Sequence, residues 1–141
     1  MAASGDIAVG DPPPGQPGWK IGIATIGTRT NEVDCTLLLR NAGVSTSGDS
    51  EQFIEMNGAR YSHIINPATG LGLTERIQAT IIGPDATTTD SLDTTLSVLG
   101  VKRGLALADS LPGVAALIST VHDGKIERFP SRRFKKLRQV K

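Results

Sequence analysis

Segments with the pattern of β-strands fill most of the first 84 residues, whereas the helical pattern is confined to residues 87–110. Strands followed by helices and then by a hairpin indicate an α+β domain, with two helices on one face of a largely antiparallel sheet. Asn57-Gly58 lies between two strand-like runs and predicts a tight hairpin turn. The predicted strands are residues 6–10, 19–25, 33–39, the two arms of 52–66, 76–84, 114–121 and 125–129.

The first predicted helix covers residues 87–100, where Leu92, Leu96 and Leu99 form one apolar stripe and Gly100 is the stop signal. The second covers residues 101–110 and ends at Leu111-Pro112-Gly113. Residues 41–50 are rich in turn formers and small polar groups, so we expect them to form a connection.

Composition excludes several classes of protein. A length of 141 residues suits one domain. The single cysteine, Cys35, cannot form an internal disulfide, and no Cys/His cluster has zinc spacing. No apolar run reaches the roughly 18 residues of a membrane span, and the first ten residues lack a signal-peptide pattern. As written, the chain is expected to stay in the cytoplasm.

Charge divides the chain into a domain at 1–130 and a basic tail at 131–141. The domain contains all 14 acidic residues and nine of the 15 basic residues, and the tail contains the other six. A basic tail could bind the phosphate groups of a nucleic acid or of an anionic lipid. The favoured interpretation is a solvated helix end that Phe134 and Leu137 could dock onto the domain, and no nucleic-acid partner is expected.

His63 lies in the stretch RYSHIINPATG, residues 60–70, where a strand-like run stops at Pro67. Alternation places Tyr61, His63 and Ile65 on one face of that strand. Because sites gather at strand ends, His63 is a candidate for a metal ligand or a catalytic group. On these residues alone, a structural histidine remains the favoured interpretation.

Asp90 and Thr94 are spaced i, i+4 and therefore share one face of the first predicted helix, away from the leucine stripe. A carboxylate and a hydroxyl there suit Mg²⁺, and a helix N-terminus suits a phosphate. The alternative is that Thr87 and Asp90 form a capping box.

Residues 45–53, STSGDSEQF, contain small side chains that allow a ligand to approach the backbone. Asp49 and Glu51 could accept hydrogen bonds from its hydroxyls or amides. A polar loop before a hairpin would have the same composition, so this signal is weak.

Taken in this order, these stretches resemble one family. The segments STSGDSEQF, GARYSHIINPATG, IGPDATTTDSLDTTLSVLG and GLALADSLPG are similar to the C-terminal half of ApbE, the FAD:protein FMN transferases, which have a T-fold type domain. The similarity runs from about Asp6 to about Val121. Its two central motifs are specific in combination.

The resemblance implies a reaction and roles for residues. Family members cleave the pyrophosphate of FAD and attach FMN to a threonine or serine hydroxyl of a target protein, with Mg²⁺ neutralising the pyrophosphate. Asp90 and Thr94 match the metal ligands, and His63 matches the histidine beside the reacting hydroxyl. FAD contacts are implied at Ser47, Gly48, Asp49, Glu51 and His63.

Four positions depart from the family pattern. Asn66 stands where an acidic residue is usual, and Ala68 where arginine is usual. Ser50 replaces an aromatic residue, which removes an expected flavin or adenine contact. Asp93 replaces a small residue, so it would either join the metal site or repel the phosphates.

The resemblance also implies an N-terminal half that supplies much of the FAD pocket, in proteins that are usually exported or lipid-anchored. Without that half we expect impaired transfer. Three explanations stay open: the reading frame starts late, the gene is a fragment, or another chain supplies the missing half. Exposed sheet edges and apolar surface would favour self-association or aggregation. The alternative function is a non-catalytic remnant that binds FAD or a nucleotide, or an interaction module.

Overall fold

The computed structural model describes residues 1–3, 5–27, 32–48 and 53–140. Within these residues, strands are the commonest regular elements, and they are interrupted by one α-helix and one short 3-10 helix. In chain order the elements are β1 (Ala2–Ala3), β2 (Asp6–Val9), β3 (Trp19–Ala24), β4 (Val33–Leu39), β5 (Ala42–Gly48), β6 (Phe53–Met56), β7 (Ala59–Ser62), β8 (Ile65–Asn66), β9 (Leu71–Gly72), β10 (Arg76–Gly83), α1 (Ala86–Ser110), β11 (Ala115–His122), β12 (Lys125–Pro130), η1 (Phe134–Lys136) and β13 (Gln139–Val140).

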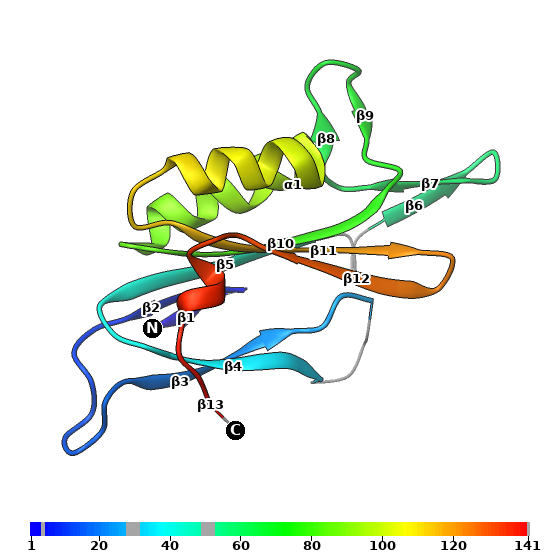
Figure 1. Ribbon diagram of the computed structural model, residues 1–141. Helices are drawn as coiled ribbons and strands as arrows, with labels where there is room; N and C mark the ends of the chain where they lie inside the picture. Colours follow the sequence, from blue (N-terminus) through cyan, green and yellow to red (C-terminus); the bar gives the residue numbers. More distant parts are fainter. Residues whose placement is uncertain (4, 28–31, 49–52, 141) are drawn as a thin grey trace.

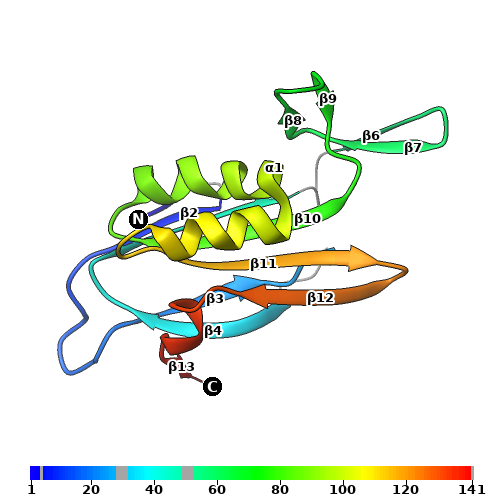
Figure 2. The same cartoon turned by 45° about the horizontal axis from the view of Figure 1, so that its top comes forward.

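A six-stranded antiparallel sheet in the order β1-β2-β5-β10-β11-β12 forms the centre of the fold. Helix α1 covers one face, and the three-stranded sheet β13-β4-β3 covers the other (Figure 1). The hairpins β6–β7 and β8–β9 extend beyond the sheet, as Figure 2 also shows. The predicted α+β class with a largely antiparallel sheet is confirmed.

Two apolar cores result from the alternation of side chains along the central strands. On β10, Ile77, Ala79 and Ile81 pack with Leu96 of α1, whereas Ile82 packs with the β3–β4 side. Leu96 is 0% exposed and Leu92 packs against the same core, so these two members of the predicted leucine stripe face the sheet.

The two predicted helices are not separate elements. Ala86–Ser110 form a single helical element with a sharp bend at Gly100, whose φ is 72° and ψ is 178°. Its two halves lie side by side over the sheet (Figures 1 and 2). Gly100 was predicted as a stop signal, but this glycine turns the helix back at positive φ with no intervening loop.

Residues 41–50 were expected to be a connection, and that prediction is wrong for Ala42–Gly48. They form β5, a central strand that pairs with both β2 and β10. Its small residues reflect close packing against α1: a Cβ at Gly43 would lie 2.3 Å from the carbonyl carbon of Asp85. Small side chains in a strand, not a turn, account for this composition.

The basic C-terminal segment packs onto the domain. Phe134 is 3% exposed and belongs to the core between the two sheets, where Leu137 also packs. Strand β13 then pairs with β4. The docking through Phe134 and Leu137 agrees with the interpretation favoured from the sequence, although the segment forms only the short 3-10 helix η1.

The predicted turns are present. Asn57 and Gly58 both have positive φ between β6 and β7, as the Asn-Gly signal requires. Gly70 has φ of 71° at the end of the Pro67 turn. Within the described ranges, no helix has the length and apolar character needed to cross a membrane.

Candidate metal and phosphate site

The start of α1 is fixed by Asp85, which corrects the capping-box alternative. The Asp85 carboxylate accepts hydrogen bonds from the backbone N–H and the hydroxyl of Thr88, at 2.8 and 2.9 Å. These hydrogen bonds hold the pKa of Asp85 below its usual value. Thr87 lies inside the helix, so Asp90 is not needed as the partner of an N-cap residue.

The first turns of α1 lie close against β5. Besides the glycine contact at Gly43, the hydroxyls of Ser45 and Thr89 are 2.8 Å apart in a buried hydrogen bond. Gly83 also allows close approach, because a Cβ there would lie 2.9 Å from the methyl group of Thr89. This packing sets the position of Asp90, which directly follows Thr89, and of Asp93 one turn further along the helix.

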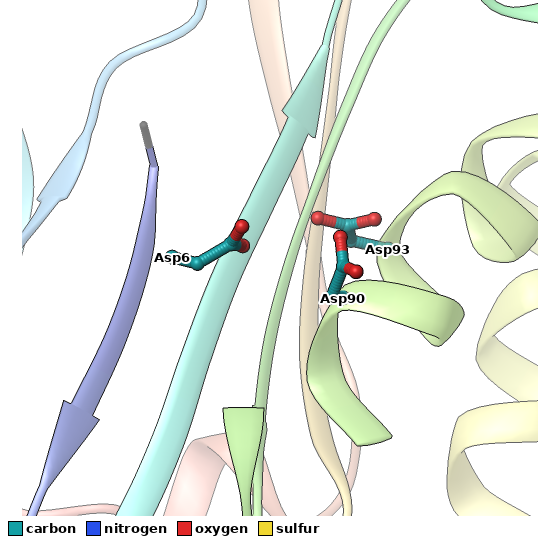
Figure 3. A group of neighbouring side chains, drawn as sticks. All are labelled: Asp6, Asp90 and Asp93. Atoms are coloured by element: carbon teal, nitrogen blue, oxygen red, sulfur yellow. The ribbon is translucent and has the colours of Figure 1, made fainter. Parts of the chain in front are cut away.

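Three carboxylates meet beside α1. Ligand oxygens of Asp6, Asp90 and Asp93 all lie within 4.8 Å of one another. Figure 3 shows Asp6 on β2 pointing toward the two aspartates of α1. Three carboxylates so close are mutually repulsive unless a proton or a cation intervenes, and oxygen ligands of this kind suit Mg²⁺.

Asp93 is the buried member of this cluster, at 3% exposure. Burial raises its pKa to about 6, and the nearby charges of Asp90 and Asp6 add to the effect. Hydrogen bonds from the backbone N–H and hydroxyl of Thr94 act in the opposite direction. Of the two alternatives for Asp93, joining the metal site requires that it lie close to Asp90 and Asp6, and it does.

Asp93 should make stability depend on pH. The folded pKa of about 6 lies above the ordinary 3.8, so the folded state is penalised once the carboxyl ionises. The penalty is absent below about pH 4, grows as pH rises, and is complete above about pH 6, where it amounts to roughly 3 kcal/mol. In metal-depleted buffer, Asp93→Asn should therefore raise the free energy of unfolding at pH 8 and change it little at pH 3.5.

Urea unfolding at the two pH values measures this difference, and Asp123→Asn at the exposed β11–β12 turn is the control. A loss of stability at pH 8 in Asp93→Asn would instead mean that the charged form is stabilised by its surroundings.

Thr94 is exposed, and its hydroxyl lies 3.4 Å from the hydroxyl of Ser47 on β5. The structure thus places Ser47 of β5 beside Thr94, which follows Asp90 by one turn of α1. Gly48 ends the same strand. Asp49 and Glu51, predicted to contact FAD, and Ser50 lie outside the described residues.

His63 lies in a bend directly after β7 and is exposed. The predicted strand through residue 66 is interrupted at this point, because β7 ends at Ser62 and β8 begins only at Ile65. Ser62 and Ile64 are buried and His63 and Ile65 are exposed, so the predicted alternation of faces is kept. The carboxylate cluster found among the described residues does not include His63. His63 lies between β7 and β8, whereas the three carboxylates lie on β2 and α1.

Asn66 keeps the turn that follows His63. Its side-chain oxygen accepts a hydrogen bond from the N–H of Ala68 at 2.9 Å, and its carbonyl accepts one from Gly70 at 2.8 Å. A neutral amide can make the contact that an aspartate would make here. The departure at Asn66 thus leaves the turn intact.

Asp6 was not predicted as a site residue. Its position in a short N-terminal strand carries no signal in itself, because the strand's partner, β5, was not recognised. An acidic residue on the helix-facing side of β2 could have been identified only after this pairing was known.

Comparison with known proteins agrees with this architecture. The fold is similar to that of flavin transferases of known structure. ApbE from Thermotoga maritima superposes with a TM-score of 0.76 at 35% identity, covering 94% of this chain and 42% of that protein. The flavin transferase ApbE from Vibrio cholerae gives 0.79 at 28% identity, covering 96% and 43%.

The sequence comparisons agree. The model of the ApbE family matches residues 1–118, and the chain belongs to this family. FAD:protein FMN transferases from Vibrio cholerae and Haemophilus influenzae are 32% and 34% identical over 83% and 87% of this chain. The matched parts are 35% and 36% of those proteins, so the chain spans about a third of their length.

Proposed function

We propose that the chain takes part in Mg²⁺-dependent transfer of FMN from FAD to a threonine or serine hydroxyl of a target protein. The observation that carries this proposal is the group formed by Asp6, Asp90 and Asp93 beside the start of α1, in a fold shared with flavin transferases. FAD and a target protein are the partners that the names of the relatives suggest.

The donor set fits Mg²⁺. Its atoms are carboxylate oxygens, with the Thr94 hydroxyl next to Asp93 at 3.1 Å, and hard oxygen ligands are what this ion prefers. Asp90 and Thr94 would hold the ion, and Asp6 and Asp93 are near enough to add charge. When bound, Mg²⁺ supplies positive charge at the pyrophosphate.

The protein groups have separate tasks in this proposal. Ser47 and Gly48 on β5 border the helix start and would lie against the FAD phosphates, together with Asp49 and Glu51. His63 would take the proton of the acceptor hydroxyl or orient it.

The test uses the 141-residue chain with FAD, Mg²⁺ and an acceptor protein, and mass spectrometry detects added FMN. We expect little labelling by this chain alone, since the relatives' activity belongs to proteins about three times as long and small misplacements are costly in phosphoryl transfer. Adding the N-terminal part of a relative should raise it. Metal-dependent FAD binding with no labelling under either condition would favour the nucleotide-binding remnant.

His63→Ala should reduce transfer to the target hydroxyl more than it reduces FAD binding, because a base acts on the reacting state and not on the ground state. The measurement compares the rate of FMN labelling with the FAD dissociation constant, using the 141-residue chain together with the N-terminal part of a relative if the chain alone is inactive. His122→Ala is the matched control, since His122 is exposed at the β11–β12 turn beside Asp123. Equal losses of FAD affinity and of labelling rate would mean that His63 lines the FAD pocket and does not act on the acceptor hydroxyl.

A further inference from the structure

A cleft of about 250 Å³ lies away from the carboxylate cluster, where the segment after β12 passes the end of α1. It is lined by Asp109, Arg132, Arg133 and Lys136. Figure 2 shows η1 and the preceding residues below α1 and beside β11 and β12. None of these four residues has a role in the proposed transfer.

Both arginines of the cleft are held in place by hydrogen bonds. The backbone N–H and Nε of Arg132 donate to the two carboxylate oxygens of Asp109, at 2.9 and 3.1 Å. Nη1 of Arg133 donates to the carbonyls of Leu111 and Val114, at 2.9 and 3.0 Å. Within the described part of the chain, these contacts do not use the terminal Nη groups of Arg132 or the Nε and Nη2 groups of Arg133, and they fix the direction of each guanidinium.

The lining has an excess of positive charge. Three cations face one carboxylate, and that carboxylate is already bound to Arg132. After Glu127 the sequence contains no acidic residue, and the cations Lys135 and Arg138 flank Lys136 in the sequence. Like charges held at fixed positions repel one another unless an anion is bound between them.

We propose that this cleft binds a phosphate group. The excess of two positive charges matches the charge of a phosphate at neutral pH better than that of a carboxylate. Several oxygens of one phosphate can also accept bonds from both guanidinium groups and the Lys136 ammonium at once. Phe134 and Leu137, the large apolar residues of this segment, pack into the protein core. They are therefore not available to insert into a lipid bilayer, and the charged groups of the cleft would make the contact.

The phosphate could belong to a soluble molecule or to a lipid headgroup, and one experiment separates them. The full 141-residue chain is titrated with inorganic pyrophosphate in metal-depleted buffer, followed by NMR shifts of the backbone N–H groups. Vesicles of phosphatidylcholine with phosphatidic acid form the second arm. Saturable shifts at residues 109–112 and 131–136 are expected.

Lys136→Gln should weaken pyrophosphate binding roughly tenfold, and Arg132→Gln should do so too. Lys125→Gln, at the exposed β11–β12 turn, should leave it unchanged. Because Lys136 is exposed, its variant should fold even if Arg132→Gln loses the Asp109 contact. Vesicle binding that pyrophosphate displaces would assign a headgroup phosphate, and pyrophosphate binding alone would assign a soluble ligand.

Absence of saturable pyrophosphate binding would overturn the proposal. Equal affinity in Lys136→Gln and Lys125→Gln would also overturn it, as would vesicle binding that pyrophosphate does not displace. The last result would indicate a diffuse electrostatic attraction of the basic segment, in which no single cleft is occupied.

Discussion

Asp90→Ala is expected to abolish Mg²⁺-dependent FMN transfer, in this chain or in one restored to the length of its relatives. Asp90 is exposed on α1 and is one of the three carboxylates within 4.8 Å. Loss of a direct ligand should weaken Mg²⁺ binding by more than about a hundredfold, since even groups that only support a ligand can cost 10–100-fold. Calorimetric Mg²⁺ titration gives a readout independent of activity.

The fold should survive this substitution. Asp85, not Asp90, caps the helix, and removing one of three neighbouring negative charges should leave metal-free stability unchanged or higher. Asp85→Ala is the matched comparison: it should lower the melting temperature and leave the carboxylates in place. If Asp90→Ala keeps full activity and Mg²⁺ affinity but melts earlier, Asp90 has a structural role and the metal assignment is wrong.

Gly43→Ala is expected to destabilise the fold strongly. A Cβ at this position would lie 2.3 Å from the carbonyl carbon and 2.6 Å from the backbone nitrogen at the Asp85–Ala86 junction. Backbone atoms on a helix start cannot rotate away as a flexible side chain can, so β5 and α1 must separate. We expect a loss of about 3 kcal/mol in the free energy of unfolding.

Urea unfolding of Gly43→Ala and Gly10→Ala provides the comparison. No atom lies within 4 Å of a Cβ built at Gly10, so this second variant should be nearly neutral. Gly43→Ala should also weaken Mg²⁺ binding, because the helix start that carries Asp90 would move. Equal stability of the two variants would show that the strand and helix adjust without cost.

The fold class could be predicted because local signals agree with one another. The Asn57-Gly58 turn and the apolar stripe through Leu96 depend on residues close in the chain. The bend at Gly100 and strand β5 were missed for a different reason. Small residues in β5 fit a loop equally well until the packing of α1 onto Gly43 is known.

The site was predictable in part. Asp90 and Thr94 share a helix face by their spacing alone, and family resemblance gave them a role. Asp6 and the burial of Asp93 depend on the pairing of β2 with β5 and on the packing of α1 over that pair. Spacing along a helix cannot reveal such a neighbour, because 84 residues separate Asp6 from Asp90 in the numbering.

The participation of Asp6 links the edge of the sheet to the carboxylate cluster. Strand β2 has four residues and pairs with β5 through Ile7, Ala8 and Val9, which is a short ladder that should open locally more easily than β10 or β11. A cation bound by both Asp6 and Asp90 would connect β2 to α1 and so stabilise the pairing of β2 with β5. Binding of the ion would then slow hydrogen exchange at the backbone N–H groups of β1 and β2. Exchange rates in these two strands would therefore measure how far the cation site is occupied.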